Sequence, residues 1–163
     1  MEFKVRESRR TDVPQILELI KELARYEKAE EEVAISEETL IRDGFEKERW
    51  FTCVVADIAN TVVGFALFYP KYSTWKGKAL YLEDLLVSEK HRRGGIGEEL
   101  FKTVVQRARL WGCQRMEWQV LDWNEPAIEF YKKMGADLDP TWINGKLFPN
   151  DFSRILGAEE LKS

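Results

Sequence analysis

The sequence predicts an α/β (mixed α+β) domain: one mixed, mostly antiparallel twisted sheet with helices on both faces. Two observations support this fold class. First, β-rich runs follow one another in the middle of the chain, with a turn-like segment between two of them, as in an antiparallel hairpin. Second, amphipathic helical patterns come before these runs and then alternate with later ones, which is typical of a sheet covered on both sides.

The N-terminal part of the chain predicts one strand and two helices. Residues 3–6 form a short β-rich run. Thr11 suits the N-cap of a first helix, in which apolar residues recur at helical spacing to about Lys28. Ser36 suits the N-cap of a second, shorter helix, and Gly44 is expected to end it.

Three strands are expected in the middle of the chain and one more near residue 120. The runs 51–56 and 62–69 are rich in β-forming residues, and the turn-like residues 57–61 between them predict a hairpin. The run 79–87 is the third central strand, and 116–121 is the last strand of the sheet.

Two helices are expected in the C-terminal half. The glycine-rich segment 92–97 opens a helix that Gly112 is expected to end. A last helix is expected to start at Asn124. The tail beyond it shows less pattern, although Asn144-Gly145 predicts a turn or a hairpin.

Composition indicates a single compact globular domain over residues 1–163. The chain is 44% hydrophobic and 33% charged, which is typical of a globular protein and argues against disorder. Its net charge is -4 and acidic residues gather between Glu22 and Glu38, so it lacks the basic face that nucleic-acid binding needs. This charge suits a cationic substrate, although a solvated acidic surface explains it equally well.

Membrane, secretory and metal-binding classes are disfavoured by the sequence. The longest uncharged stretch, 58–70, is too short to span a bilayer, and the N-terminal residues lack the apolar core of a secretory signal. Cys53 and Cys113 lack the spacing of zinc ligands or of a disulfide framework, and His91 is the only histidine. We therefore expect a cytoplasmic protein with no metal site and no membrane or nucleic-acid partner.

The strongest local signal is the glycine-rich segment between the third central strand and the next helix. Glycines let a ligand approach the backbone, and successive N–H groups at a helix N-terminus favour a phosphate. The segment lacks the Gly-Lys-Ser/Thr ending of a Walker A loop and the spacing of a dinucleotide fingerprint. From these residues alone, a plain glycine-rich turn remains the alternative. The segment reads Arg92-Arg93-Gly94-Gly95-Ile96-Gly97.

The pattern Arg92-x-x-Gly95-x-Gly97 resembles the pyrophosphate loop of the GNAT superfamily of N-acetyltransferases. Three more segments resemble its diamine acetyltransferase branch (spermidine/spermine N1-acetyltransferase-like), and the likeness covers about residues 3–137. These segments are residues 21–27, Tyr81-Leu82-Glu83-Asp84, and Asn124-Glu125-Pro126 with Phe130-Tyr131. The resemblance implies the GNAT fold and acetyl-CoA as the co-substrate.

The resemblance also implies which residues bind acetyl-CoA. The strand before the loop would hold the pantetheine arm through its backbone, at Leu85, Leu86 and Val87. The loop and the first helical turn would hold the pyrophosphate, at Arg92, Arg93, Gly94, Gly95, Ile96, Gly97 and Glu98. The last helix would contact the cofactor arm, at Asn124, Glu125, Pro126 and Tyr131. Asn124 could equally serve only as an N-cap.

Glu83 is a candidate catalytic residue. It lies in a run of apolar residues that should be largely buried, and a buried carboxylate needs a partner or a chemical purpose. An exposed or salt-bridged residue on an edge face is the alternative. The resemblance assigns Glu83 the role of general base, acting through water. Such a base is needed because a lysine-type amine has a reference pKa of about 10.4 and is almost fully protonated at neutral pH.

Tyr131 is the second candidate. It shares an apolar helical stripe with Phe130 and Met134, so its spacing alone favours a core residue. The resemblance instead implies that Tyr131 points out of the core and protonates the departing CoA thiolate, whose thiol has a reference pKa of about 8.5. Transfer would be direct, in a ternary complex, with a backbone N–H of strand 85–87 holding the oxyanion.

The identity of the amine is less determined. The resemblance implies an acceptor site lined by Tyr26, Glu27, Glu83, Glu117, Trp118 and Gln119. Polyamine-preferring members carry Tyr-Asp-x-Trp where this chain has Tyr72-Ser73-Thr74-Trp75, which removes one negative charge. The longer run 72–77, with residues 120–124, resembles the thialysine Nε-acetyltransferase subgroup. We therefore expect thialysine or a related amino-acid amine, with spermidine or spermine as the alternative.

Two further expectations concern partners and function class. The family usually forms homodimers, so a homodimer is implied for this chain. A non-catalytic acetyl-CoA-binding module is a different class of function, but the presence of both Glu83 and Tyr131 argues against it.

Overall fold

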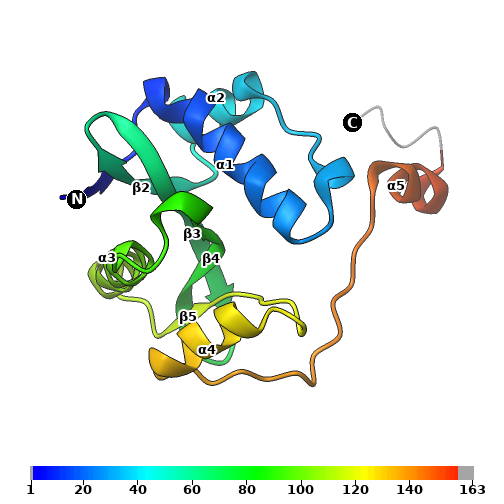
Figure 1. The fold of residues 1–163 in the computed structure, drawn as a ribbon. Coiled ribbons are helices and arrows are strands. Elements are labelled where there is room, and N and C mark those ends of the chain that lie inside the picture. Colours follow the sequence, from blue (N-terminus) through cyan, green and yellow to red (C-terminus); the bar gives the residue numbers. More distant parts are fainter. Residues whose placement is uncertain (1, 158–163) are drawn as a thin grey trace. The chain divides into compact units, whose positions relative to one another are not determined.

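The computed structural model describes residues 2–157. The chain forms two compact units, which divide between Leu121 and Asp122. The first unit contains a five-stranded sheet in the order β1-β2-β3-β4-β5 (Figure 1). Its strands are β1 (Lys4–Glu7), β2 (Thr52–Ile58), β3 (Thr61–Ser73), β4 (Gly77–Val87) and β5 (Arg115–Glu117). All neighbours pair antiparallel except β4 and β5, so the predicted mixed, mostly antiparallel sheet is confirmed.

Helices cover both faces of this sheet, as expected. The first unit contains α1 (Val13–Tyr26), α2 (Glu37–Phe45) and α3 (Ile96–Leu110). Ile16 and Leu19 of α1 pack in a buried cluster with Phe65 of β3. On the opposite face, Trp111 at the end of α3 packs on Phe68, with ring centroids 5.7 Å apart. Figure 1 shows α1 and α2 on one side of the strands and α3 on the other.

The start of α1 differs from the prediction. Asp12, not Thr11, is the N-cap residue, and Thr11 lies in a short 3-10 turn. The reason is that the Asp12 carboxylate accepts hydrogen bonds from the Arg9 N–H at 2.6 Å and from the Arg6 guanidinium at 2.8 Å. These bonds tie the end of β1 to the start of the helix, and they involve Arg6 and Arg9, which lie before the segment that a helix N-cap preference considers.

The start of α2 is set by a cap, and the glycine near its end is explained by packing. Ser36 is the N-cap as predicted, because its Oγ accepts a hydrogen bond from the Thr39 N–H at 3.2 Å. The prediction that Gly44 ends the helix was wrong, since the helix continues to Phe45. Gly44 is instead required by packing: an added Cβ would lie 2.3 Å from the ring of Phe51.

The predicted hairpin is confirmed with a tighter turn. Ala59 and Asn60 form its two-residue loop, both with positive φ, while the other expected turn residues belong to β2 or β3. Asn60 N–H donates to the Asp57 carboxylate at 2.8 Å, which holds this turn. β3 and β4 form a second hairpin, in which Ser73 pairs with Gly77.

β5 is shorter than predicted. The strand ends at Glu117, and residues 118–121 are not in a strand. Only Ala79, Leu80 and Tyr81 of β4 have partners in β5. The β-forming composition of 116–121 could not reveal this end, because a strand stops where its partner diverges.

The second unit contains α4 (Glu125–Lys133) and α5 (Pro149–Leu156). The predicted start of α4 is confirmed, because Asn124 caps it by accepting the Ala127 N–H at 3.4 Å. The turn or hairpin predicted at Asn144-Gly145 was wrong, since residues 136–148 form no turn, strand or helix. A two-residue turn makes a hairpin only where flanking strands pair, and none do so here.

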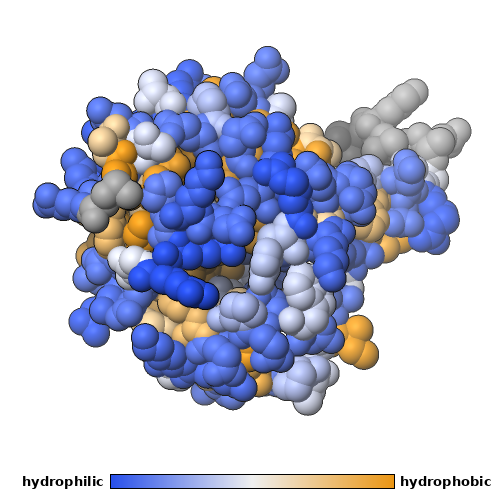
Figure 2. All heavy atoms as spheres, in the orientation of Figure 1, coloured by the Kyte–Doolittle hydropathy of each residue, from blue (hydrophilic) through white to orange (hydrophobic). Residues whose placement is uncertain are grey.

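The described part of the chain offers no helix with the length and apolar character needed to cross a membrane. The same residues contain no group of three metal-ligating side chains. The face drawn in Figure 2 is mostly hydrophilic, with smaller apolar areas between the charged side chains.

Candidate active site

β4 carries a bulge at its two carboxylates. Leu67 and Phe68 are consecutive in β3, yet they pair with Asp84 and Leu82 of β4. Glu83 is therefore an extra residue in β4, opposite no single partner. A bulge interrupts the alternation of a strand and changes the direction of the side chains that follow.

The bulge leaves Glu83 exposed, so the expectation of a buried carboxylate at this position was wrong. The side chain is held by a partner instead of by apolar surroundings, because the Tyr69 hydroxyl donates to Glu83 Oε2 at 2.7 Å. Burial raises the pKa of Tyr69 above its usual range, and the adjacent Glu83 carboxylate raises it further. Tyr69 thus remains a neutral donor, and Glu83 is accessible to a ligand.

Asp84 is the more enclosed of the two carboxylates, being partly buried, and the sequence alone did not single it out. Burial, and then the negative charges of Glu83 and Glu27, raise its pKa to about 7. Its charge would be favoured by a cation nearby. The sequence signal was present, since Asp84 stands beside Glu83 in the same apolar run, but only the bulge decides which of the two is enclosed.

Carboxylates from three elements gather around these two residues. Tyr81 of β4 pairs with Tyr69 on one side and with Glu117 of β5 on the other. The two tyrosine rings stack with centroids 5.4 Å apart. Burial raises the pKa of Glu27, at the end of α1. We call this surface, made by Glu27, Tyr69, Lys71, Tyr81, Glu83, Asp84 and Glu117, the acidic face.

The expected acceptor residues are only partly brought together. Glu27, Glu83 and Glu117 belong to the acidic face, whereas Trp118 packs edge-on against Phe101 of α3, with centroids 5.5 Å apart. Since α3 covers the opposite side of the sheet, Trp118 packs on the other face from Glu117, and its place in the acceptor site stays a prediction. Adjacent residues of an extended chain point to opposite faces. Gln119 is exposed beyond the end of β5.

One edge of β4 has no strand partner past the bulge. β3 pairs with β4 as far as Val87, while β5 pairs with it only as far as Tyr81. The Ser88 N–H donates to Val63 of β3, so by alternation the Leu85 and Val87 N–H groups face the other edge. Among the described residues no strand covers this edge, which leaves backbone donors and acceptors for a ligand.

The glycine-rich loop continues from this open edge. Gly95 is the N-cap of α3 with φ +81, and Arg93 also has a positive φ of 68. An added Cβ on Gly95 would meet no described atom within 4 Å, so the loop surface is open. The first-turn amides of a helix have no intrahelical acceptor and favour an anion. Gly94 is exposed, Gly97 is half-buried, and the buried side chain of Ile96 anchors the loop.

Arg92 links the loop to two neighbours. Its Nε donates to the Val87 carbonyl at 3.1 Å, and its guanidinium lies 5.5 Å from the ring centroid of Tyr26 at the end of α1. Tyr26 therefore lies against the loop. On the first turn of α3, Glu98 pairs with Lys102 at 2.8 Å.

The remaining candidates lie in the second unit. Glu125 and Pro126 form the first turn of α4 and are exposed. Tyr131 is buried, with 8% of its surface exposed, and its ring packs edge-on against Phe130 at a centroid distance of 5.3 Å. This packing agrees with the apolar stripe that the spacing predicts, whereas the resemblance implies a Tyr131 that points out of the core.

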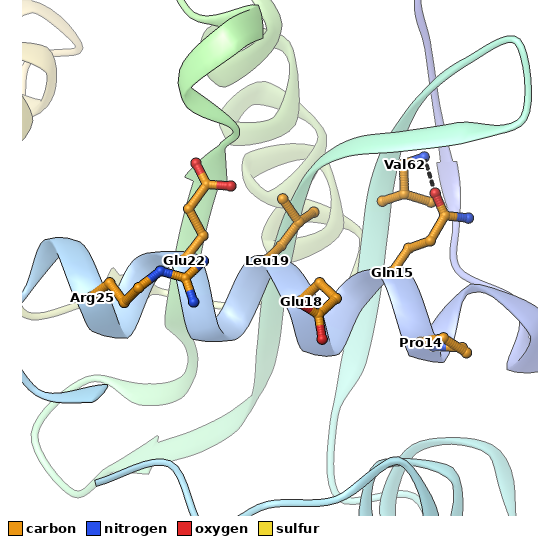
Figure 3. Close-up of a pocket in the computed structure, with 7 residues that line it drawn as sticks. All are labelled: Pro14, Gln15, Glu18, Leu19, Glu22, Arg25 and Val62. Atoms are coloured by element: carbon orange, nitrogen blue, oxygen red, sulfur yellow. Dashed lines mark hydrogen bonds between the residues drawn. The ribbon is translucent and has the colours of Figure 1, made fainter. Parts of the chain in front are cut away.

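A separate hollow of about 430 Å³ follows α1 and is lined by Pro14, Gln15, Glu18, Leu19, Glu22, Arg25 and Val62 (Figure 3). Its polar side chains support the backbone. Gln15 accepts the Val62 N–H at 2.8 Å, and Glu22 accepts the Glu89 N–H at 2.9 Å. Two carboxylates against one guanidinium make it a poor phosphate site.

Comparison with known proteins gives consistent matches. Residues 13–136 match the profile of the acetyltransferase (GNAT) family. The chain is 44% identical over 140 residues to the thialysine N-epsilon-acetyltransferase of Bos taurus, covering 81% of this chain and 82% of that protein. It is 37% identical over 141 residues to spermidine/spermine N(1)-acetyltransferase-like protein 1 of Homo sapiens, covering 82% of this chain and 20% of that protein. Among solved structures, an integron cassette protein from V. cholerae superposes with a TM-score of 0.78 at 25% identity, covering 97% of this chain and 99% of that one. The resemblance noted in the sequence is thereby confirmed.

Proposed function

This chain belongs to the GNAT family of acetyltransferases, and from that premise we propose that it acetylates the terminal amine of a small amino acid such as thialysine. The observation that carries the proposal is the acidic face beside the open edge of β4. A protonated amine is attracted by the carboxylates there, and the edge next to them presents backbone donors. The thialysine N-epsilon-acetyltransferase relative at 44% identity supports the choice of acceptor.

Acetyl-CoA is the proposed co-substrate and supplies an activated acetyl group as a thioester. The open edge fits an extended pantetheine arm, because Leu85 and Val87 direct N–H groups outward. The loop fits a pyrophosphate, because it combines the N-terminus of α3 with the positive charges of Arg92 and Arg93. Leu86, Gly94, Gly97 and Glu98 complete this proposed site through the strand and the first helical turn.

In the proposed reaction, Glu83 accepts a proton from the ammonium group of the substrate, directly or through one water, and the neutral amine attacks the thioester carbonyl. A C–N bond forms, the C–S bond breaks as the CoA thiolate leaves, and the nitrogen releases its second proton to solvent. The exposure of Glu83 and its hydrogen bond from Tyr69 support the role of base, since a base must be both reachable and oriented. A Leu85 or Val87 N–H stabilises the oxyanion as charge develops. On the sequence resemblance alone, we propose Tyr131 as the donor of a proton to the leaving sulfur and Asn124, Glu125 and Pro126, at the start of the same helix, as contacts of the cofactor arm.

The second candidate function is acetylation of a polyamine. The spermidine/spermine N(1)-acetyltransferase-like relative at 37% identity favours it, as do the several carboxylates of the acidic face. A polycation would gain from each of these charges, whereas an amino acid also brings a carboxylate that they repel.

The deciding experiment measures CoA-thiol release from acetyl-CoA with thialysine, lysine, spermidine and putrescine. We expect turnover to be highest with thialysine and to fall strongly in Tyr131→Phe. Highest turnover with spermidine would establish the second candidate. If wild-type protein binds acetyl-CoA but acetylates none of the four, the small-amine proposal is wrong.

We also propose that the protein acts as a homodimer, as its sequence resemblance implies, and that it lies in the reducing cytoplasm, which its two free cysteines suit. Light scattering coupled to size-exclusion chromatography tests the dimer: a mass near 38 kDa supports it, being twice the 19.1 kDa of one chain, and a mass near 19.1 kDa contradicts it.

A further inference from the structure

Lys71 places a positive charge on the acidic face. Its Nζ lies 3.3 Å from Glu117 Oε1 and 5.3 Å from the ring centroid of Tyr81. The Lys71 side chain is 45% exposed, so packing does not force the charge into this position. An exposed ion pair contributes little to stability. A site built only to attract polycations would gain nothing from an ammonium group here, because it repels them.

The Lys71–Glu117 pair presents opposite charges side by side. The head group of an α-amino acid also carries opposite charges on adjacent groups. When such a head group binds, Lys71 and Glu117 can separate, and each can form a charge-assisted hydrogen bond with the oppositely charged group of the ligand. A diamine offers only the positive half of this match, and its second ammonium would meet Lys71.

We infer that Lys71 binds the carboxylate of an amino-acid acceptor while Glu117 binds its α-ammonium, and that this pair selects amino acids over diamines. The inference rests on the proposed function, since it concerns the substrate of the same site. Lys71 would thus be a specificity-determining residue of the acidic face.

A short series of side-chain contacts links Lys71 to the proposed base. Lys71 Nζ lies 5.3 Å from the ring centroid of Tyr81, this ring stacks on Tyr69 with centroids 5.4 Å apart, and the Tyr69 hydroxyl donates to Glu83 at 2.7 Å. Five single bonds of about 1.5 Å, from the α-carbon to the terminal nitrogen of lysine, span about 6 Å when extended. A head group at the Lys71–Glu117 pair therefore lets the terminal amine extend toward the proposed base.

Glu117 keeps a second cation when Lys71 turns toward a ligand. Arg115 Nε lies 3.5 Å from Glu117 Oε2, on the opposite carboxylate oxygen from Lys71. Movement of Lys71 thus leaves no unpaired carboxylate, which would otherwise be costly in this partly buried position. Lys71 is the more mobile partner, because its side chain is 45% exposed and that of Glu117 is 24% exposed.

The test uses acceptors that differ only by the carboxylate: L-lysine against cadaverine, and L-ornithine against putrescine. We measure kcat/KM for each pair with wild-type protein and with Lys71→Met, which removes the charge and keeps the length. The ratio of amino acid to diamine should fall about tenfold or more, mainly through KM, because a head-group contact acts in the ground state and the transition state alike. Lys71→Arg should keep most of the wild-type ratio, and Lys71→Glu should lower it further.

Lys47→Met is the matched control, since Lys47 is exposed in the loop after α2. It should leave both ratios unchanged. If Lys71→Met lowers kcat/KM equally for both members of each pair, or changes neither, the assignment of Lys71 is wrong while the proposed function stands. Thialysine is assayed beside them: if wild-type protein acetylates thialysine but none of the four acceptors, the assignment of Lys71 is wrong, and if it acetylates none of the five, the proposed function fails as well.

Discussion

The acidic face and the glycine-rich loop differ in how the chain builds them. The loop is contiguous, and its geometry depends mainly on local features such as the left-handed Gly95 and the N-terminus of α3. The acidic face draws its charged residues from α1, β3, β4 and β5, which lie up to 90 positions apart in sequence. A contiguous motif can be recognised from the sequence, whereas a surface assembled from distant segments depends on how the strands pair.

The two regions also differ in charge, and each sign suits a different proposed ligand. The loop carries Arg92 and Arg93 at a helix N-terminus, which favours an anion. The acidic face carries several carboxylates and one lysine, which favours a cation with a carboxylate of its own. The open edge of β4 runs between them, from the bulge at Glu83 to the Val87 carbonyl bound by Arg92.

The largest expected effect is a loss of activity toward the amine that leaves acetyl-CoA binding unchanged, which distinguishes the acidic face from the loop. Glu83→Gln should lower kcat/KM for the amine about 100-fold or more, because it removes the proposed base. The KM for acetyl-CoA should stay within about twofold, since the loop is unchanged, and the loss should shrink at high pH as the free amine deprotonates. Steady-state kinetics between pH 7 and 10 measure this. Glu48→Gln, an exposed control, should behave as wild type. Near-normal activity of Glu83→Gln at pH 7 would falsify the assignment.

The second prediction compares the two ends of α3. Gly95 and Gly112 both have positive φ, +81 and +72, and neither has a described atom within 4 Å of an added Cβ. Replacing either by alanine should cost about 1 kcal/mol of unfolding free energy through backbone strain. Only Gly95→Ala should also raise the KM for acetyl-CoA, by about tenfold, because only Gly95 shapes the proposed phosphate loop. Thermal denaturation and cofactor titration measure the two quantities. Equal KM values for acetyl-CoA in both variants would show that the loop does not bind the cofactor.

The third prediction concerns the enclosed carboxyl of the acidic face. Asp84 has a pKa of about 7 in the folded protein, raised from 3.8. Below pH 3.8 the Asp84 carboxyl is protonated in both the folded and the unfolded protein. Between pH 3.8 and 7 it ionises only in the unfolded chain, so the folded state loses stability as the pH rises. Above pH 7 this loss of stability is complete. Asp84→Asn cannot ionise. Its Tm should therefore exceed that of wild type by about 3 °C or more at pH 8, and by much less at pH 4.

Calorimetry at the two pH values measures this difference for Asp84→Asn. The expected cost of the substitution is a higher KM for the cationic amine at pH 8, because one attracting charge is lost. An equal Tm difference at pH 4 and pH 8 would show that Asp84 does not titrate in this range.

The smallest expected effect tests how the acidic face orients its proposed base. Tyr69→Phe removes the hydroxyl that donates to Glu83 at 2.7 Å but keeps the ring that stacks on Tyr81. It should lower kcat for the amine about two- to tenfold and leave the Tm nearly unchanged. Tyr72→Phe, in an exposed position of the same strand, is the matched control for the kinetic assay. A loss in Tyr69→Phe as large as that in Glu83→Gln would mean that the hydroxyl has a direct chemical role.

Local features of the fold were predictable where neighbouring residues determine them. Ser36 and Asn124 cap their helices as their side chains and positions suggested, because each cap bonds an amide three residues away. The hairpin between β2 and β3 was predictable for the same reason. The end of β5 and the start of α1 were not, because they depend on β4 and on Arg6 respectively.

The sequence by itself determined the family, the glycine-rich loop and the identity of the candidate residues, because those signals lie in the order of the side chains. Tertiary structure decided which carboxylate is enclosed, since a bulge set by the pairing of β3 with β4 exposes Glu83 beside a half-enclosed Asp84. It also brought Lys71 to Glu117 across 46 positions and turned Trp118 to the opposite face. Strand register and alternation, which involve distant residues, control these outcomes.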